Sequence, residues 1–364
     1  MELTKCKLGE LITQRREKND GSDLPICGVS KDGLIPPKQK DADTSIYNVF
    51  YRDDFIFNPA RMELNSIAIN DMYDRAICSS LYEVFYVHRT DLLLPHYLEL
   101  IIRQKWFTRY CKFLGQGSAR EYCRFGNISE IEIEFPPIEE QQKIVEYNTA
   151  IENRIALKQK INDNLEAQAN AIFSSSAPDF TDLQPIHNFG TVITGKTPPT
   201  SVAEYYGNDI PFIKTPDMHG NVYITSSECS LSKAGADSQK NKYIPENTVV
   251  VACIGANAGE VALTSYIAQT NQQINAIISK YPCFLYFSIK AHTVELRTLG
   301  EGSSTMININ KTSFENYEIP TPSDNTLQQL EHKLNIIFSA ILHNLQEIDR
   351  LNETKDLLVN QLSR

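Results

Sequence analysis

The chain has 364 residues, of which 41% are apolar and 22% are charged. This length accommodates two domains with separate hydrophobic cores, and the composition is that of an ordinary globular protein. No apolar run approaches the roughly 18 residues that a membrane-crossing helix requires, and residues 1–5 lack the features of a signal peptide. We therefore expect a cytoplasmic protein.

The formal net charge of −10 argues against a protein with an extensive basic surface. DNA responds to the local field of one face, so a DNA-binding face remains compatible with this charge if the acidic residues lie elsewhere. The eight cysteines form no Cys-x-x-Cys pair, and the seven histidines form no His-Glu-x-x-His pair. We predict buried, reduced cysteines and no metal site.

The first globular part is predicted to cover residues 1–136. Tyr82–Val87 has the apolar and aromatic composition of a short strand, and His96–Phe113 has a helical pattern. Gly, Asn and Pro turns connect such segments. This mixture predicts an α+β domain, although the pattern leaves its topology open.

A long helix is predicted next, over residues 137–176. Glu139–Phe173 contains no glycine or proline, and Pro136-Pro137 precedes it, as is common at a helix start. Its apolar residues recur at steps of mostly four or seven, which places them on one face: Ile144, Ile151, Ile155, Ile161, Leu165, Ala169 and Ile172. At 1.5 Å per residue this helix would be roughly 50 Å long.

A second globular part and a second long helix follow, over residues 177–322 and 323–364. Ser174–Pro178 ends the first helix, and Thr248–Ala252 is a strand-like run in the second globular part. The final helix begins near Asp324. It carries a heptad seam that slips by one residue midway, formed by Leu327, Leu330, Leu334, Ile337, Ile341, Leu345, Ile348, Leu351, Leu358 and Leu362.

Short segments of the first half recur in the same order in the second half, at offsets close to half the chain length. The matches are Leu8-Gly9 with Phe189-Gly190, Ile67–Ile69 with Val261–Leu263, Leu114–Ser118 with Leu299–Ser303, Phe135-Pro136 with Ile319-Pro320, and Gln141-Gln142 with Gln328-Gln329. The order of the matches predicts a tandem duplication. The alternative is two unrelated domains with coincidental matches.

The two long helices each have one apolar stripe, and packing the helices together buries both stripes. Because the helices end equivalent halves of the chain, a pseudo-two-fold arrangement would make them antiparallel. The predicted fold is therefore α+β, with two mixed α/β domains in tandem separated by two antiparallel coiled-coil helices. The alternative is that each helix covers only its own domain.

Gly190–Thr197 matches the phosphate-binding pattern G-x-x-x-x-G-K-[ST]. That loop requires a buried strand before it and a helix after it, whose amides hold the phosphates. Thr181–Asn188 is not a buried strand, and Pro198-Pro199 is an awkward helix start. We predict an exposed loop with Lys196 as a surface cation rather than a nucleotide site.

Asn58–Arg61 faintly resembles the Asn-Pro-Pro-aromatic loop of adenine methyltransferases. The aromatic residue that would stack on a flipped base is missing, and no glycine-rich methyl-donor loop lies near it in the sequence. No Ser-His-Asp or Cys-His set is identifiable either. The sequence therefore offers no catalytic centre.

Several longer segments resemble the specificity subunits of type I restriction–modification systems, across essentially the whole chain. These segments are Phe57–Ala68, Gly117–Phe125, Pro136–Ile144, Gly195–Pro198, Asp209–Ile213 and Asn310-Lys311. The Pro-Pro-x-Glu-Glu-Gln-Gln entry into the first long helix is the most specific of them. The second copy departs from it, because Pro320–Asn325 replaces that entry.

The resemblance implies that each globular part is a target-recognition domain for one half of a split double-stranded DNA target, and that the helices set the gap. It also implies that two methyltransferase subunits dock on the helical region and that restriction–translocase subunits join this core. Methyl donor, ATP and Mg²⁺ would be bound by those partners, and this chain would carry no cofactor.

Side chains that contact base edges in the major groove are typically Arg or Lys for guanine and Asn or Gln for adenine. Candidates for DNA contact in the first domain are Lys31, Arg61, Arg120 and Arg124, each beside turn residues. In the second domain they are Lys196, Lys214, Gln272, Gln273 and Lys311. Gly117 and Gly302, in the repeated Gly-x-Gly segments, are candidate backbone turns beside the groove.

Each candidate cation has an alternative role as a solvated surface charge, and Arg61 has one as the buried partner of a carboxylate. Two other functions remain open for the whole chain. One is a methyltransferase or nuclease that acts alone, and the other is a coiled-coil scaffold that does not touch DNA.

Overall fold

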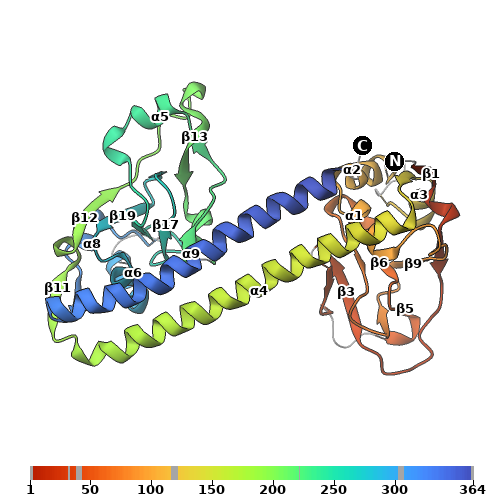
Figure 1. Cartoon of the computed structure of the whole chain (residues 1–364), viewed down its shortest axis with the longest axis horizontal. Helices are drawn as coiled ribbons and strands as arrows, with labels where there is room; N and C mark the ends of the chain where they lie inside the picture. The colour runs from red at the N-terminus through yellow and green to blue at the C-terminus, as the bar shows by residue number, and fades with distance from the viewer. Residues whose placement is uncertain are drawn as a thin grey trace. The chain divides into compact units, whose positions relative to one another are not determined.

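The computed structural model describes residues 3–31, 33–37, 43–115, 122–220, 222–301 and 307–361. The chain forms two compact units: unit 1 comprises Met1–Asn153 and Asn352–Arg364, and unit 2 comprises Arg154–Leu351. Two long helices, α4 (Ile138–Ser176) and α9 (Asp324–Gln361), each contribute to both units (Figure 1). Among the described residues, no helix is both long and apolar enough to cross a membrane.

The described residues of unit 1 form two four-stranded sheets, a two-stranded ribbon and three short helices, besides parts of α4 and α9. The first sheet has the order β2 (Ile12–Arg15), β9 (Glu83–Val87), β6 (Phe55–Phe57), β7 (Ile67–Ile69). The second has the order β4 (Gly33–Ile35), β3 (Ile26–Ser30), β8 (Arg75–Cys78), β5 (Asn48–Tyr51). β1 (Thr4–Lys7) pairs with β10 (Glu132–Phe135). The helices are α1 (Pro95–Ile102), α2 (Lys105–Gly115) and α3 (Phe125–Ser129), and the 3-10 turns are η1 (Leu8–Glu10), η2 (Thr44–Ile46) and η3 (Pro59–Leu64).

Unit 2 contains a five-stranded sheet, a three-stranded sheet and a ribbon. The five-stranded sheet has the order β12 (Gly190–Thr194), β19 (Ile274–Ser279), β16 (Val249–Ala252), β17 (Val261–Thr264), β14 (Tyr223–Ile224). The three-stranded sheet has the order β15 (Ser230–Leu231), β13 (Tyr206–Ile213), β18 (Gln269–Thr270), and the ribbon pairs β11 (Asp182–Pro185) with β20 (Glu318–Thr321). The helices are α5 (Lys233–Asp237), α6 (Pro282–Ala291), α7 (Thr293–Gly300) and α8 (Lys311–Glu315). The 3-10 turns are η4 (Ala177–Asp179), η5 (Ile186–Asn188), η6 (Ala203–Tyr205), η7 (Thr215–Met218) and η8 (Lys240–Lys242).

The central strands of each unit are apolar on both faces because each face meets a different layer. In unit 1, Phe55 and Phe57 of β6 pack with residues of α1 and α2, whereas the intervening Ile56 packs with residues of the second sheet. In unit 2, Val249 and Val251 of β16 pack with α6 and α9, whereas Val250 packs with residues such as Ile213. This period-two alternation produces continuous apolar runs in the sequence rather than an alternating pattern.

The two units share one topology, which confirms the tandem duplication. The main sheets of the two units have the same strand order and the same antiparallel pairing: β2, β9, β6, β7 in unit 1 and β12, β19, β16, β17 in unit 2. The parallel pair β3–β8 corresponds to the parallel pair β13–β18, and the ribbon β1–β10 corresponds to β11–β20. The predicted fold class, two mixed α/β domains in tandem with two long helices, is therefore confirmed.

The structure also corrects parts of the sequence alignment between the halves. The match of Ile67–Ile69 with Val261–Leu263 is correct, because both are the strand beside the central one. Leu8 corresponds to Ile186 rather than to Phe189. The Leu8 N–H donates to the carbonyl of Ile131, just before β10, and the Ile186 N–H donates to the carbonyl of Tyr317, just before β20. An apolar residue beside a glycine recurs too often along a chain to fix an alignment by itself.

The two long helices run antiparallel, as the sequence predicts. Within unit 2, Arg154 and Lys158 of α4 form ion pairs with Glu347 of α9, and Asn162, further along α4, bonds to Asn344, which precedes Glu347 on α9. The predicted seam residues Leu327, Leu330, Leu334 and Ile341 are buried. Ile161, predicted on the apolar face of α4, is 37% exposed instead.

All eight cysteines are free thiols. Six are buried, as predicted, and Cys6 and Cys229 are half-buried.

Candidate nucleic-acid interface

Unit 1 has a groove of about 910 Å³ that brings together three of the predicted DNA-contact residues. It is lined by β3, the start of η3, the segment Ser79–Glu83 and the residues that precede α3. Lys31, Arg61 and Arg124 line it with exposed side chains, whereas residues such as Val29 are buried beneath it. A concave surface with an apolar floor and convergent cations has the character of a binding site.

The segment Asn58–Arg61 is a turn that positions Arg61 on this groove. The Asn58 side chain accepts a hydrogen bond from the Ala60 N–H at 3.1 Å, and Pro59 takes the first position of η3. The Cys123 N–H donates to the Pro59 carbonyl at 3.0 Å, which ties this turn to the segment that carries Arg124. Among the described residues Arg61 forms no ion pair, and it is exposed. The alternative of a buried carboxylate partner for Arg61 is therefore wrong.

Lys31 and Arg124 reach the groove by different means. The Lys31 carbonyl accepts a hydrogen bond from Nη1 of Arg103 at 2.8 Å, which fixes the end of β3 and leaves the ammonium exposed. Arg124 forms an ion pair with Glu83 at 3.2 Å, and its guanidinium lies 5.3 Å from the centre of the Tyr122 ring. Glu83 and Tyr122 also line the groove, and neither was predicted from the sequence.

Three predicted site residues, Gly117, Arg120 and Gly302, lie outside the described residues. Their partners in the repeated Gly-x-Gly segments, Gly115 and Gly300, are the last residues of α2 and α7. A Cβ atom on Gly300 would come within 2.6 Å of the Ile307 side chain, so close packing requires a glycine there.

In unit 2, three loops bring together Lys196, Lys214, Gln272 and Gln273. The Lys196 N–H donates to the Thr270 carbonyl at 2.9 Å, and the Asn271 N–H donates to the Ile213 carbonyl at 3.1 Å. Hydrogen bonds between side chains connect the same loops. Thr197 Oγ1 donates to Gln272 Oε1 at 2.6 Å, and Thr215 Oγ1 donates to Gln273 Oε1 at 3.4 Å. Four of the five candidates in this domain therefore lie in one cluster.

Within this cluster, Lys196 and Gln272 are exposed, whereas Lys214 and Gln273 are half-buried. The Lys214 ammonium donates to Cys229 Sγ at 2.8 Å, and this hydrogen bond raises the pKa of Lys214. Lys311 is held by its own helix instead, since its ammonium lies 3.1 Å from Glu315 one turn along α8.

The G-x-x-x-x-G-K-[ST] segment has no nucleotide-binding geometry. Gly190–Thr194 is the strand β12, and among the residues that the structure describes no helix begins between Lys196 and Val202. A Cβ atom on Gly195 would lie 2.1 Å from the Asn271 carbonyl oxygen. Gly195 is therefore required for the close approach of two loops, and Lys196 beside it is exposed, as predicted.

Helix α2 carries three further cations that sequence reasoning missed: Lys105, Arg109 and Lys112. All three are exposed, and within the described ranges none forms an ion pair. Tyr110 and Phe113, which are stacked at 6.2 Å, lie exposed on the same helix. The signal was present in the sequence, because this eleven-residue helix has three cations and no carboxylate. α2 packs against η3, which lines the groove.

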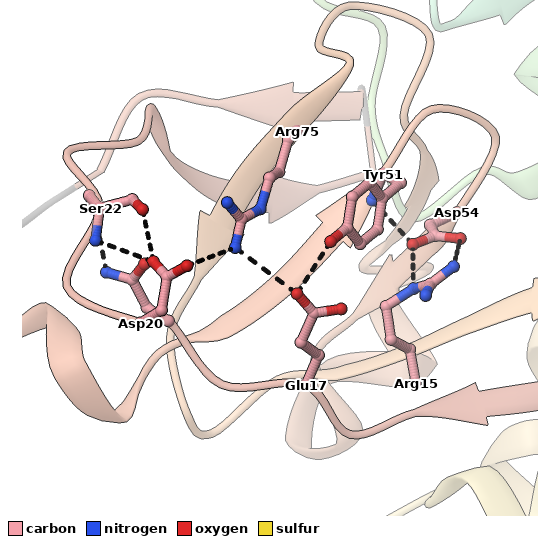
Figure 2. Close-up of polar contacts among 8 residues, drawn as sticks. Arg15, Glu17, Asp20, Ser22, Tyr51, Asp54 and Arg75 are labelled. Carbon is pink, nitrogen blue, oxygen red and sulfur yellow. Dashed lines mark hydrogen bonds and ion pairs between the residues drawn. The ribbon is translucent and has the colours of Figure 1, made fainter.

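Other cations of unit 1 are neutralised within the fold, as Figure 2 shows. Arg15 donates to the buried carboxylate of Asp54 at 2.6 and 3.0 Å, and burial raises the pKa of Asp54. The Tyr51 hydroxyl donates to Glu17 at 2.8 Å, and Arg75 lies 3.5 Å from the same carboxylate. These contacts link β2, β5 and β8, whereas Lys31 and Arg61 of the groove and the three cations of α2 form no ion pair with the described residues.

Comparisons with known proteins agree with this architecture. Residues 6–167 and 183–356 match the family described as the type I restriction modification DNA specificity domain. The type I restriction enzyme HindI specificity subunit of Haemophilus influenzae is 30% identical over 355 residues, covering 75% of this chain and 77% of that protein. The MjaIX specificity subunit of Methanocaldococcus jannaschii is 27% identical over 183 residues, covering 48% of this chain and 42% of that protein.

A crystal structure of the S subunit of a type I restriction–modification system from M. genitalium has the same fold, with a TM-score of 0.63 at 12% identity. That comparison covers 99% of this chain and 96% of the M. genitalium chain. The family match extends over both units and over most of both long helices. The chain therefore belongs to the family of type I restriction–modification DNA specificity domains.

Proposed function

We propose that this chain is the DNA sequence-recognition subunit of a type I restriction–modification enzyme. Each unit would recognise one half of a bipartite target through base edges in the major groove. The observation that carries this proposal is the repetition of one fold, with a cluster of exposed cations in unit 1 and a cluster of lysine and glutamine side chains in unit 2. Phosphate contacts would position the protein, and base contacts would specify the sequence.

The long helices would set the gap between the two halves of the target. α4 has 39 residues and α9 has 38, which at 1.5 Å per residue corresponds to about 57–59 Å. Half-sites on one face of the duplex lie roughly 34–36 Å apart for each helical turn of DNA. Helices of this length are of the right order to act as a spacer.

The helices would also bind the methyltransferase subunits, two of them in the proposed assembly, and restriction–translocase subunits would join this core. Large apolar side chains that remain exposed on α4 and α9 support a protein partner there: Tyr147, Leu157, Ile336 and Leu357. In this proposal the enzyme works in the cytoplasm. The chain itself is non-catalytic, and methyl donor, ATP and Mg²⁺ bind to its partners.

An exchange of residues 1–136 for the corresponding domain of another family member tests modular recognition. Mapping of methylated adenines in cells that carry the complete system should show a change in one half of the target only. If both halves change, or neither does, modular recognition is wrong.

A second experiment separates this proposal from an enzyme that acts alone. The purified chain is incubated with DNA, methyl donor, ATP and Mg²⁺, with and without its partner subunits. We expect methylation and cleavage only with the partners, and turnover by the chain alone would contradict the proposal.

A further inference from the structure

Arg124 has a defined orientation, because described residues contact both its backbone and its side chain. Its backbone N–H donates to Asn127 Oδ1 at 2.9 Å, and its carbonyl accepts from the Asn127 N–H at 2.9 Å, so the main chain is fixed at the start of α3. The side chain is 65% exposed and lines the groove. An exposed arginine normally samples many rotamers, and ordering it costs free energy on binding.

Glu83 restrains one edge of the Arg124 guanidinium. Only 14% of the Glu83 side chain is exposed, and its Oε2 atom accepts the Phe125 N–H at 2.7 Å. Its other oxygen, Oε1, accepts Nη1 of Arg124 at 3.2 Å. The carboxylate is therefore anchored to the backbone of α3 before it engages the arginine.

Tyr122 restrains the face of the same guanidinium. The Arg124 Cζ atom lies 5.3 Å from the centre of the Tyr122 ring, within the range of a cation–π contact. With Nη1 engaged by Glu83, the Nη2 and Nε donors make no hydrogen bond to the described residues. Two adjacent donors on one planar edge match the O6 and N7 acceptors of guanine in the major groove.

The described residues of unit 2 contain no counterpart of this arrangement. The Cys123 N–H bonds to the Pro59 carbonyl in unit 1, and the Ile309 N–H bonds to the Cys253 carbonyl in the same way in unit 2. Ile309 therefore corresponds to Cys123. It follows that Asn308 corresponds to Tyr122 and Asn310 to Arg124. Asn275 takes the place of Glu83, because Glu83 pairs with Phe57 of β6 and Asn275 pairs with the equivalent Val251 of β16. Its side chain bonds to Thr194 and Cys253 instead. The Glu83–Tyr122–Arg124 set is therefore a property of unit 1 and distinguishes its groove from the corresponding surface of unit 2.

We propose that Arg124, oriented by Glu83 and Tyr122, recognises a guanine in the half-target bound by unit 1. This inference rests on the proposed function. Arg124 contacts the base, whereas Glu83 and Tyr122 are positioning residues. The half-target of unit 1 accordingly contains at least one G·C pair whose identity depends on Arg124.

The test uses the chain assembled with its methyltransferase subunits and measures methylation at every position of the target. Arg124→Ala should reduce discrimination at one G·C pair in the half-target of unit 1 by about 5- to 150-fold, as expected for the loss of one bidentate contact. Arg124→Lys keeps the charge but loses the planar fork, and it should relax the same position. Preference at all other positions should stay unchanged.

Glu83→Gln should relax that same position with a smaller effect, because the amide no longer holds the guanidinium by charge. A thermal unfolding measurement accompanies this variant, since Glu83 also bonds to the backbone of α3. The matched control is Arg52→Ala, which removes an exposed arginine from an ion pair with Asp74 (2.9 Å) that does not line the groove. This control should change no position.

The inference is overturned if both Arg124 variants keep the wild-type preference at every position, or if the relaxed position is not a G·C pair of the half-target of unit 1. Failure of the proposed function has a different signature. In that case the wild-type assembly methylates without a bipartite target, or the target does not change when unit 1 is exchanged.

Discussion

The Nδ2 atom of Asn344 donates a hydrogen bond to Oδ1 of Asn162 at 2.7 Å, between α9 and α4. The Lys158 ammonium also donates to Asn344 Oδ1, at 2.8 Å. Asn344 is 9% exposed. Asn162 is half-buried. A polar pair of this kind favours the one alignment of the two helices in which both partners meet, because a shift separates them. We therefore infer that this pair fixes the register of α4 against α9 within unit 2.

We predict that Asn344→Leu lowers the free energy of unfolding by about 1–3 kcal/mol, because Asn162 Oδ1 loses its donor and the Lys158 ammonium loses one of its two acceptors. The double variant Asn162→Leu, Asn344→Leu should recover part of this loss, which urea denaturation in a double-mutant cycle would measure. Lys355→Gln, which breaks an exposed pair with Glu152, is the control and should cost less than about 1 kcal/mol. An Asn344→Leu variant as stable as the wild type would refute the assignment.

We predict that replacing Lys105, Arg109 and Lys112 together by glutamine weakens binding of the assembled protein to all DNA sequences alike. Each lost phosphate contact should reduce the slope of log affinity against log salt by about 0.9, so the triple variant changes it by up to about 2.7. The target sequence should remain the same. Fluorescence anisotropy over a salt series measures both quantities.

A triple variant at Lys7, Arg52 and Arg89 removes the same number of charges and serves as its control. These cations are exposed but paired with Glu130, Asp74 and Asp91, so the salt slope should change little. An equal effect of the two triple variants would mean that net charge, rather than the surface of α2, governs binding.

We predict that Gly195→Ala disrupts the cluster of loops in unit 2. The added Cβ would lie 2.1 Å from the Asn271 carbonyl oxygen and 2.2 Å from Thr270 Oγ1, so the loops that carry Lys196 and Gln272 must separate. The variant should lose more than about 1 kcal/mol of stability and bind the second half-target more weakly. Gly126→Ala in α3, where a Cβ meets nothing within 4 Å, is the matched control and should be neutral or slightly stabilising.

Glu331 of α9 holds the start of α6, because its two carboxylate oxygens accept the N–H groups of Cys283 and Phe284 at 3.0 and 2.8 Å. Glu331→Ala should therefore destabilise the protein by about 1–3 kcal/mol. Glu331→Gln retains one acceptor oxygen and should cost less. Thermal or urea unfolding of the two variants at neutral pH would rank them, and equal stability of Glu331→Ala and wild type would contradict this role.

The same residue gives a pH dependence. Burial raises the pKa of Glu331 above its ordinary value of 4.5. The folded state then binds the proton more tightly than the unfolded state, so the contribution of this group is complete below pH 4.5 and is lost as the pH rises through the folded pKa. The unfolding free energy of wild type minus that of Glu331→Gln should fall across this window. A difference that rises with pH would show that the hydrogen bonds outweigh burial.

The sequence alone determined the features that depend on local periodicity and order along the chain. Glu139–Phe173 lacks glycine and proline and follows two prolines, and the helix α4 begins at Ile138. The order of the repeated segments was enough to predict two copies of one fold. The same reasoning wrongly placed Ile161 on the buried face of α4. A helical period does not show which of two neighbouring residues, Ile161 or Asn162, faces the partner helix.

Tertiary structure decided which side chains meet. Lys31, Arg61 and Arg124 are far apart in the sequence, and long-range contacts bring their segments to one groove. Among these are the bond of Ser66 Oγ to the Val29 carbonyl and the bond of the Cys123 N–H to the Pro59 carbonyl. Glu83 gave no signal, since a carboxylate at the start of a strand is ordinary until Phe125 and Arg124 bond to it. Periodic patterns report on neighbours in the chain, whereas a binding surface is made by long-range strand pairing that a single sequence does not encode in any local pattern.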